Sequence, residues 1–245
     1  MKKKLIVGGV GDILLSVDKG RKCIMGVDLW SHFPHAKELV EMLGITVNHF
    51  EYYKTPPPPI PGEIVEKVTM PEWVETFKDF HILDAPAQKK LIGIHPFGSQ
   101  LSQDVWGKEG WPAKRISNEA ILHIIESLQH KYDFLIFGSQ KEIDSLPVEI
   151  YTHHSVYKTT MYTNMFESLG MVTWCDAMIA TDSVMKTMSA ICKIPTYVFM
   201  GNYVDTYRDA FFIDPYISNG TMKVWQFVRC TPELFDPAIN ELLLR

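Results

Sequence analysis

The chain has 245 residues, of which 46% are hydrophobic and 12% aromatic, and its 24 Lys and Arg against 29 Asp and Glu give a formal net charge of −5. This composition is typical of a folded globular protein and excludes a disordered chain, and no apolar run approaches the roughly 20 residues that span a bilayer. The negative balance disfavours nucleic acid as a partner, because nucleic-acid binding normally uses a broad basic surface.

The cysteines and the first residues bear on the compartment. The four cysteines are scattered, without a Cys-x-x-Cys pair or nearby His ligands. This pattern predicts reduced thiols, no metal site and a cytoplasmic location. The apolar stretch after the first lysines is cut at once by glycines, so it is too short for the core of a signal peptide.

In the first part of the chain, short apolar runs alternate with a helical pattern. Lys4–Val7 predicts a buried strand that ends in a glycine turn and leads into a helix near Asp12. Further strands are predicted for Cys23–Val27 and Ile45–Phe50, with a helix over Ala36–Leu43 between them.

A proline-rich segment follows. Pro56–Pro59 suits neither a central strand nor a helix interior, so we expect an exposed connector, with a polyproline ligand as the alternative. Glu63–Phe80 carries helical signals that Pro71 interrupts, and Asp84–Lys90 is typical of a linker between domains.

From residue 91 onward, strand and helix patterns alternate. The predicted strands are Leu91–Ile94, Phe134–Phe137, Ala177–Thr181 and Thr196–Met200, and the predicted helices are Asn118–His130, Met165–Trp174 and Val184–Cys192. Because each parallel pairing needs a crossover, this order predicts an α/β fold with a parallel sheet, whose ligands bind beyond the carboxyl ends of the strands. We expect domains over 1–84 and 91–230, and a C-terminal helix over 231–245 that can pack back on the N-terminal domain.

A single carboxylate follows the glycines after the first strand. Gly8, Gly9 and Gly11 allow a sharp turn, and Asp12 stands at the start of the helix, where the helix dipole favours its charge. Asp12 is therefore either a helix cap or a catalytic carboxylate. No NAD site is predicted, because apolar residues stand where the last glycine of Gly-x-Gly-x-x-Gly would fall.

Two adjacent cations belong to the loop after the Leu91–Ile94 strand. Lys114 and Arg115 can hold a diphosphate, Lys as a point charge and Arg as a planar fork, and a solvated surface pair is the alternative. His95 in the same loop is predicted to be a packed residue with one ring hydrogen bond rather than a base.

Acidic residues follow the next two strands. Gly138 forms a turn that leads to Glu142, which can accept ribose hydroxyls or stabilise the start of a helix. Asp182 or Ser183 is expected to cap a helix whose first amides can bind an anion.

In their order along the chain, these segments resemble a known family. They are Gly11-Asp12-Ile13-Leu14-Leu15, Ile94-His95-Pro96, Trp111-Pro112-Ala113-Lys114-Arg115, Gly138 with Glu142, and Ile179-Ala180-Thr181-Asp182-Ser183 through Ala190 and Pro195. The succession resembles the ADP-heptose lipopolysaccharide heptosyltransferases, glycosyltransferase family nine. The resemblance implies a GT-B-like α/β fold of two Rossmann-like domains with parallel sheets facing a central cleft, here with a reduced N-terminal domain, and no metal or other cofactor. It also implies that the N-terminal domain, 1–84, binds the acceptor and that the C-terminal domain, 91–230, binds the nucleotide sugar.

The resemblance also implies roles for single residues. Asp12 would be the general base near the acceptor hydroxyl, Lys114 the cation at the phosphates of the sugar donor, and Glu142 a nucleoside contact. Asp182 and Ser183 would line the sugar-donor site at the helix start. We add Arg115 and Gly138 to the predicted donor site from their positions in the strand-end loops.

One segment departs from the family pattern. Members usually continue the Asp182 position with Ser or Thr and then Gly, and place a His three residues after the Gly, whereas this chain has Val184 and Thr187 there. We expect Lys186 to supply replacement positive charge to the sugar donor.

The sequence therefore predicts a metal-independent, inverting glycosyltransferase that uses a nucleotide-diphosphate sugar and a saccharide acceptor, most readily a lipopolysaccharide or other surface saccharide. No stable membrane insertion is expected, and peripheral contact at the inner membrane face is allowed. A first alternative is a viral-type transferase acting on a hydroxymethylated DNA base, which a basic face would favour, built from Lys2, Lys3, Lys4, Lys19, Arg21 and Lys22. A second is a non-catalytic nucleotide-sugar-binding protein.

Overall fold

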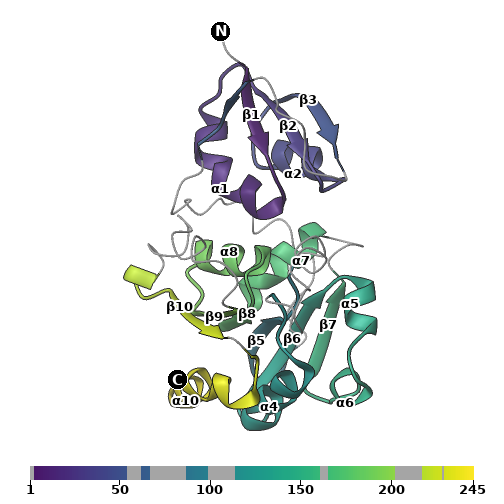
Figure 1. The fold of residues 1–245 in the computed structure, drawn as a ribbon, viewed down its shortest axis with the longest axis vertical. Coiled ribbons are helices and arrows are strands. Elements are labelled where there is room, and N and C mark those ends of the chain that lie inside the picture. The colour runs from purple at the N-terminus through teal and green to yellow at the C-terminus, as the bar shows by residue number, and fades with distance from the viewer. Residues whose placement is uncertain are drawn as a thin grey trace. The chain divides into compact units, whose positions relative to one another are not determined.

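The computed structural model describes residues 3–53, 62–66, 87–98, 114–160, 165–201, 217–227 and 229–245. These residues form two compact units, a first unit up to residue 66 and a second unit from residue 87 onward. Each contains a parallel sheet accompanied by helices (Figure 1). No helix within the described ranges has the length and apolar character that crossing a bilayer requires.

The first unit is built on a four-stranded sheet in the order β3-β2-β1-β4, in which all described pairings are parallel. Leu5 and Ile6 of β1 are almost fully buried, which suits a strand in the interior of a sheet. The elements are β1 (Lys4–Val7), α1 (Val10–Arg21), β2 (Val27–Ser31), α2 (Ala36–Met42), β3 (Val47–Tyr52) and β4 (Glu63–Ile64).

Two predicted elements of the first unit are wrong. Cys23–Gly26 forms a turn, in which the Gly26 amide donates to the Cys23 carbonyl at 2.7 Å, and the strand begins only at Val27. The sequence did not predict this strand because the charge of Asp28 interrupts its apolar pattern. In the structure, Lys3 forms an ion pair with Asp28 at 3.1 Å. The helical signal that begins at Glu63 is a short strand there, and 67–80 lies outside the described residues, as does Pro56–Pro59.

The second unit is built on a six-stranded sheet in the order β10-β9-β8-β5-β6-β7, again with parallel pairings. The α/β class with parallel sheets is therefore confirmed. The elements are β5 (Lys90–His95), α4 (Asn118–Leu128), β6 (Tyr132–Gly138), α5 (Gln140–Asp144), α6 (Val148–Tyr151), β7 (Val156–Thr160), α7 (Met165–Met171), η3 (Val172–Trp174), β8 (Ala177–Ala180), α8 (Val184–Ile191), β9 (Thr196–Gly201), β10 (Met222–Phe227), η5 (Pro232–Phe235) and α10 (Asp236–Leu244).

The strand order places a ligand-binding position in this sheet. The chain runs outward from β5 through β6 to β7 on one side, and from β8 through β9 to β10 on the other. This is the Rossmann order, in which ligands bind beyond the carboxyl ends of the strands at the point where the order reverses. That point lies between β5 and β8, where His95 pairs with Ala180.

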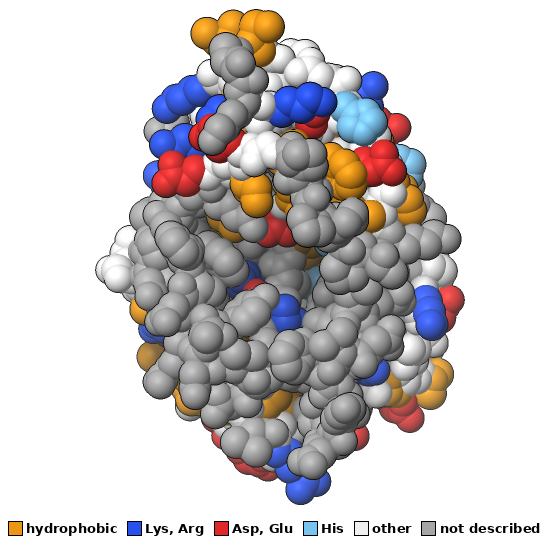
Figure 2. Space-filling view, turned by 45° about the horizontal axis from the view of Figure 1, so that its top comes forward, with side chains coloured by type: hydrophobic (Ala, Val, Ile, Leu, Met, Phe, Trp, Pro, Cys, Tyr) orange, Lys and Arg blue, Asp and Glu red, His pale blue; other side chains and the backbone are white. Residues whose placement is uncertain are grey.

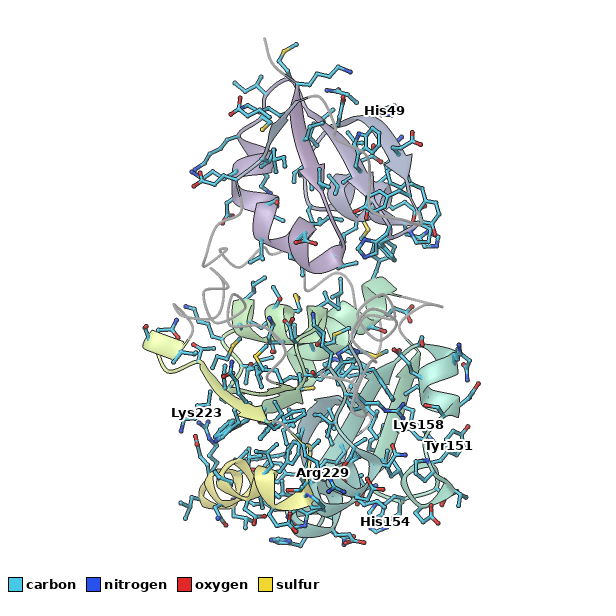
Figure 3. All side chains as sticks on the ribbon, viewed as in Figure 1. His49, Tyr151, His154, Lys158, Lys223 and Arg229 are labelled. Atoms are coloured by element: carbon cyan, nitrogen blue, oxygen red, sulfur yellow. The ribbon has the colours of Figure 1, made fainter. Side chains whose placement is uncertain are left out.

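The C-terminal helix α10 belongs to the second unit, beside α4 (Figure 1). Ala238 and Leu242 lie in the same apolar core as α4, and the Tyr132 hydroxyl donates to the Leu242 carbonyl at 2.9 Å. Lys223 of β10 donates to Glu241 of α10 (Figure 3). The apolar face of α10 thus packs against α4 within the second unit, and the expectation that 231–245 packs back on the N-terminal domain stays a prediction.

Candidate functional site

Two lysines meet on one carboxylate in the second unit. Lys114 Nζ lies 2.7 Å from Asp182 Oδ2, and Lys186 Nζ lies 2.7 Å from Asp182 Oδ1. The three side chains are 11%, 8% and 2% exposed for Lys114, Asp182 and Lys186 respectively. We call these three residues the lysine cluster; its formal charge is +1, and it is nearly removed from water.

The fold brings the lysine cluster to the point where the strand order reverses. Asp182 follows β8 closely, and Lys186 lies one helical turn further along α8, so the two side chains share a face of the helix. Lys114 arrives beside them because Arg115 forms an antiparallel bridge with Phe97, just after β5. Gly98 permits this approach, since a Cβ atom there would lie 2.3 Å from the Lys114 Cβ.

The lysines also determine the ionisation of Asp182. Burial by itself would raise the pKa of this carboxyl, but Lys186 and Lys114 outweigh burial and hold the pKa well below its usual range. Asp182 is therefore a carboxylate at neutral pH. A partly neutralised pair of fixed cations is complementary to an anionic ligand such as a diphosphate.

Three buried polar atoms near this point have no hydrogen-bond partner among the described residues. They are His95 Nδ1, Thr181 Oγ1 and Ser183 Oγ. The Thr181 amide donates to the His95 carbonyl at 3.1 Å, so two of these residues are neighbours. Burial lowers the pKa of His95 to about 3, so its ring is neutral. These atoms retain hydrogen-bonding capacity toward a ligand bound at this point.

Ser183 stands at the N-cap position of α8, but its side chain makes no cap hydrogen bond. The first amides of a helix are not satisfied within the helix, and they carry the positive end of its dipole. The start of α8 therefore adds to the positive character of the lysine cluster.

Arg115 and Gly138 lie beside Phe97 and not in the lysine cluster. The guanidinium of Arg115 lies 5.8 Å from the centre of the Phe97 ring, and Arg115 takes part in none of the ion pairs of the described residues. A Cβ atom at Gly138 would come within 3.0 Å of the same ring. The structure thus shows packing contacts for both residues and does not bring them into the lysine cluster.

Glu142 begins a helix. Its Oε2 accepts hydrogen bonds from the amide and the hydroxyl of Ser139, both at 2.7 Å, and the Ser139 hydroxyl accepts from the Glu142 amide. This reciprocal arrangement is a capping box. The helix-start role that the sequence left open is therefore present, and the nucleoside contact stays a prediction.

Asp12 of the first unit lies in the first turn of α1. Its Oδ2 accepts a hydrogen bond from the Gly9 amide at 2.8 Å. Gly8 has a φ of +127°, and a Cβ atom there would lie 2.2 Å from the same oxygen, so the carboxylate occupies space that only glycine leaves open. The half-buried carboxylate stabilises the helix start, and its role as a base stays a prediction.

Several cations of the basic face that would favour DNA have partners within the first unit. Figure 2 shows Lys and Arg side chains interspersed with Asp and Glu on the visible surface of this unit. Arg21 Nε donates to the Leu43 carbonyl at 2.7 Å. Three of the lysines form ion pairs, namely Lys3–Asp28, Lys4–Glu63 and Lys19–Glu66. Within the described ranges, no three His, Cys, Asp or Glu side chains gather as metal ligands would.

Two Rossmann-like units, the second with a cationic cluster that suits an anionic ligand, match an α/β fold of the GT-B type. Among solved structures, the chain is similar to E. coli ADP-heptose lipopolysaccharide heptosyltransferase II, with a TM-score of 0.57 and 16% identity over 99% of this chain and 98% of that chain. It is also similar to a family 9 glycosyl transferase from Veillonella parvula (TM-score 0.54, 11% identity, 99% of this chain, 89% of that chain). A third is the E. coli heptosyltransferase WaaC with ADP (TM-score 0.52, 10% identity, 97% of this chain, 99% of that chain).

No model of a known protein family matches the chain, and neither does any curated protein. At these identities the likeness to solved structures shows the fold. The GT-B-like fold expected from the sequence is therefore confirmed, and the activity is argued from the site.

Proposed function

We propose that this protein is a glycosyltransferase that moves a sugar from a nucleotide-diphosphate sugar to a hydroxyl of a lipopolysaccharide or other surface saccharide. The observation that carries the proposal is the lysine cluster, set beside unpartnered polar atoms at the ligand-binding position of a Rossmann-like sheet. The solved structures with a similar fold include enzymes named for ADP-heptose and for lipopolysaccharide, which supports this class of substrates.

The departure of the nucleotide requires positive charge. As the bond between the sugar and the diphosphate breaks, negative charge builds on the diphosphate oxygens. Lys114, Lys186 and the first amides of α8 supply fixed positive charge at one place. We include metal independence in the proposal because these groups meet that requirement.

The acceptor hydroxyl must lose its proton. We assign this role to Asp12, whose carboxylate takes the proton while the acceptor oxygen bonds to the anomeric carbon. The carbon–oxygen bond to the diphosphate breaks, and its electron pair leaves on the diphosphate. A single displacement of this kind inverts the anomeric centre. The proposal places the enzyme in the cytoplasm, in peripheral contact with the inner membrane face that presents such acceptors.

The test of the sugar-donor site is calorimetric titration of the full chain with ADP and with adenosine. Lys114→Met is expected to weaken ADP binding about ten-fold or more, through one lost charge-assisted hydrogen bond, and to leave adenosine binding unchanged. Lys37→Met is the control, because Lys37 is an exposed lysine of the first unit. Equal losses for ADP and adenosine would contradict the phosphate role.

The test of the reaction uses ADP-heptose with a deacylated lipopolysaccharide oligosaccharide. Asp12→Asn keeps an oxygen that can accept from the Gly9 amide, so the protein should fold and bind ADP but lose transfer. Transfer that survives in this variant would reduce Asp12 to a helix cap. Binding of ADP with neither transfer nor donor hydrolysis in the parent protein would support the non-catalytic alternative.

A further inference from the structure

Three polar side chains follow three neighbouring strands of the first sheet. Asp12 lies in the helix that follows β1, His32 directly follows β2, and Tyr53 directly follows β3. The strands are parallel and adjacent in the order β3-β2-β1, so their carboxyl ends meet at one edge of the sheet. We call Asp12, His32 and Tyr53 the acceptor-side cluster.

These side chains lie near one another. A Cβ atom at Gly9 would lie 2.9 Å from Cε1 and Nε2 of His32 and 4.0 Å from Asp12 Oδ2, so the imidazole and the carboxylate border the same point of the backbone. The rings of His32 and Tyr53 meet edge to face, with centroids 5.8 Å apart and an angle of 65° between their planes.

The backbone behind the cluster is held in place. Ser31, which is fully buried, donates from its hydroxyl to the Gly8 carbonyl at 2.7 Å. The Tyr53 amide donates to the Ser31 carbonyl at 3.1 Å, and the Gly8 amide donates to the Trp30 carbonyl at 3.0 Å. The ends of the three strands are thus linked by hydrogen bonds, which pre-organises the side chains that they carry.

The charge of Asp12 affects the pKa of the Tyr53 hydroxyl. The pKa of Tyr53 is raised by burial and, in addition, by the negative charge of Asp12. Tyr53 therefore keeps its proton at neutral pH and can donate a hydrogen bond. Asp12, His32 and Tyr53 are each half-buried, so each side chain keeps part of its surface exposed.

We propose that His32 and Tyr53 are acceptor-binding residues, which hold a saccharide so that one of its hydroxyls lies at Asp12. This inference rests on the proposed function and names the residues that position its second substrate. A sugar presents hydroxyls that both donate and accept, together with an apolar C–H face. A phenol, an imidazole and a carboxylate at one edge of a sheet match these groups, because the rings contact the C–H face while their polar atoms bond to hydroxyls beside the reacting one.

The inference is tested on the full chain with ADP-heptose and the deacylated lipopolysaccharide oligosaccharide. His32→Ala and Tyr53→Phe are each expected to raise the KM for the oligosaccharide about ten-fold, the order of one lost hydrogen bond in a ligand site, with the affinity for ADP unchanged. His32→Gln, which keeps a polar side chain, should recover part of the loss. A merely structural role would not produce this split between the two substrates.

Two matched variants serve as controls. His49 lies toward the amino end of β3 (Figure 3), is 54% exposed and faces Glu51, so His49→Ala should leave both substrates unaffected. Tyr52→Phe removes the hydroxyl of the exposed neighbour of Tyr53 and should also have no effect.

The outcomes separate this inference from the proposed function. Normal transfer with an unchanged KM for the oligosaccharide in His32→Ala and Tyr53→Phe would overturn the inference and leave the glycosyltransferase proposal standing. If the parent protein binds neither ADP nor any other nucleoside diphosphate, the proposed function fails, and direct titration with the oligosaccharide then decides the role of His32 and Tyr53. If His32→Ala lowers the melting temperature, the KM of Tyr53→Phe tests the inference, because this variant retains the contact between the two rings.

Discussion

Lys114, Asp182 and Lys186 depend on one another because all three are nearly removed from water. Replacing a single partner of a buried ion pair leaves an uncompensated charge, whereas an exposed pair contributes little. This difference allows the lysine cluster to be recognised in a measurement of stability.

We predict that Asp182→Asn lowers the free energy of unfolding by about 3 kcal/mol or more, since two buried ammonium groups lose a counter-charge. In a Lys186→Met background the same replacement should cost less, which urea denaturation of the double-mutant cycle would show. Glu41→Gln, in the exposed pair with Lys37, is the control and should cost less than about 1 kcal/mol. Equal losses of unfolding free energy in Asp182→Asn and Glu41→Gln would contradict a buried lysine cluster.

The lowered pKa of the buried His95 ring leads us to predict that stability depends on pH. Its pKa is lowered by burial from 6.5 to about 3, so the unfolded chain takes up a proton at a pH where the folded protein does not. The neutral ring makes its full contribution to the free energy of unfolding above pH 6.5. Below that pH the contribution falls by about 1.4 kcal/mol per pH unit, down to about pH 3. Urea denaturation between pH 7 and pH 4 should show a flatter profile for His95→Gln than for the parent protein; parallel profiles would argue against a buried neutral ring.

At the scale of single elements, the capping box of α5 separates two roles of Glu142. Glutamine also supports a capping box, so Glu142→Gln should change the free energy of unfolding by less than about 0.5 kcal/mol. If the carboxylate also receives ribose hydroxyls, ADP binding should weaken about ten-fold, as expected for a charge-assisted hydrogen bond. Titration with pyrophosphate, which lacks a ribose, is the control; an equal loss for pyrophosphate would contradict the nucleoside contact.

The strands that the sequence predicted differ physically from those that it missed. β6, β8 and β9 are buried along their whole length, so apolar runs revealed them. β7 and β10 are the two edges of the same sheet and carry polar residues such as Lys158 and Lys223. Edge strands face water on one side, and a charged side chain there costs little, which removes the apolar signal.

At the scale of the whole molecule, the two candidate sites lie in different units, each with its own parallel sheet. We predict that ADP slows amide hydrogen exchange at the ends of β5 and β8 and at the start of α8. The oligosaccharide should instead slow exchange at the turn between β1 and α1 and at the ends of β2 and β3. Hydrogen exchange measured by mass spectrometry would test this prediction. If ADP protected the first unit and left the second unit unprotected, the assignment of the two substrates would be contradicted.

The sequence by itself determined the α/β class, the buried strands, and Lys114 and Asp182 as candidates, because apolar periodicity and strand-end position are local properties of the chain. Only the tertiary structure decided that Lys114 and Lys186 meet on one carboxylate, and that His32 and Tyr53 lie beside Asp12. The reason is that the order of strands in a sheet decides which carboxyl ends are neighbours, and this order is fixed by packing between segments far apart in the chain.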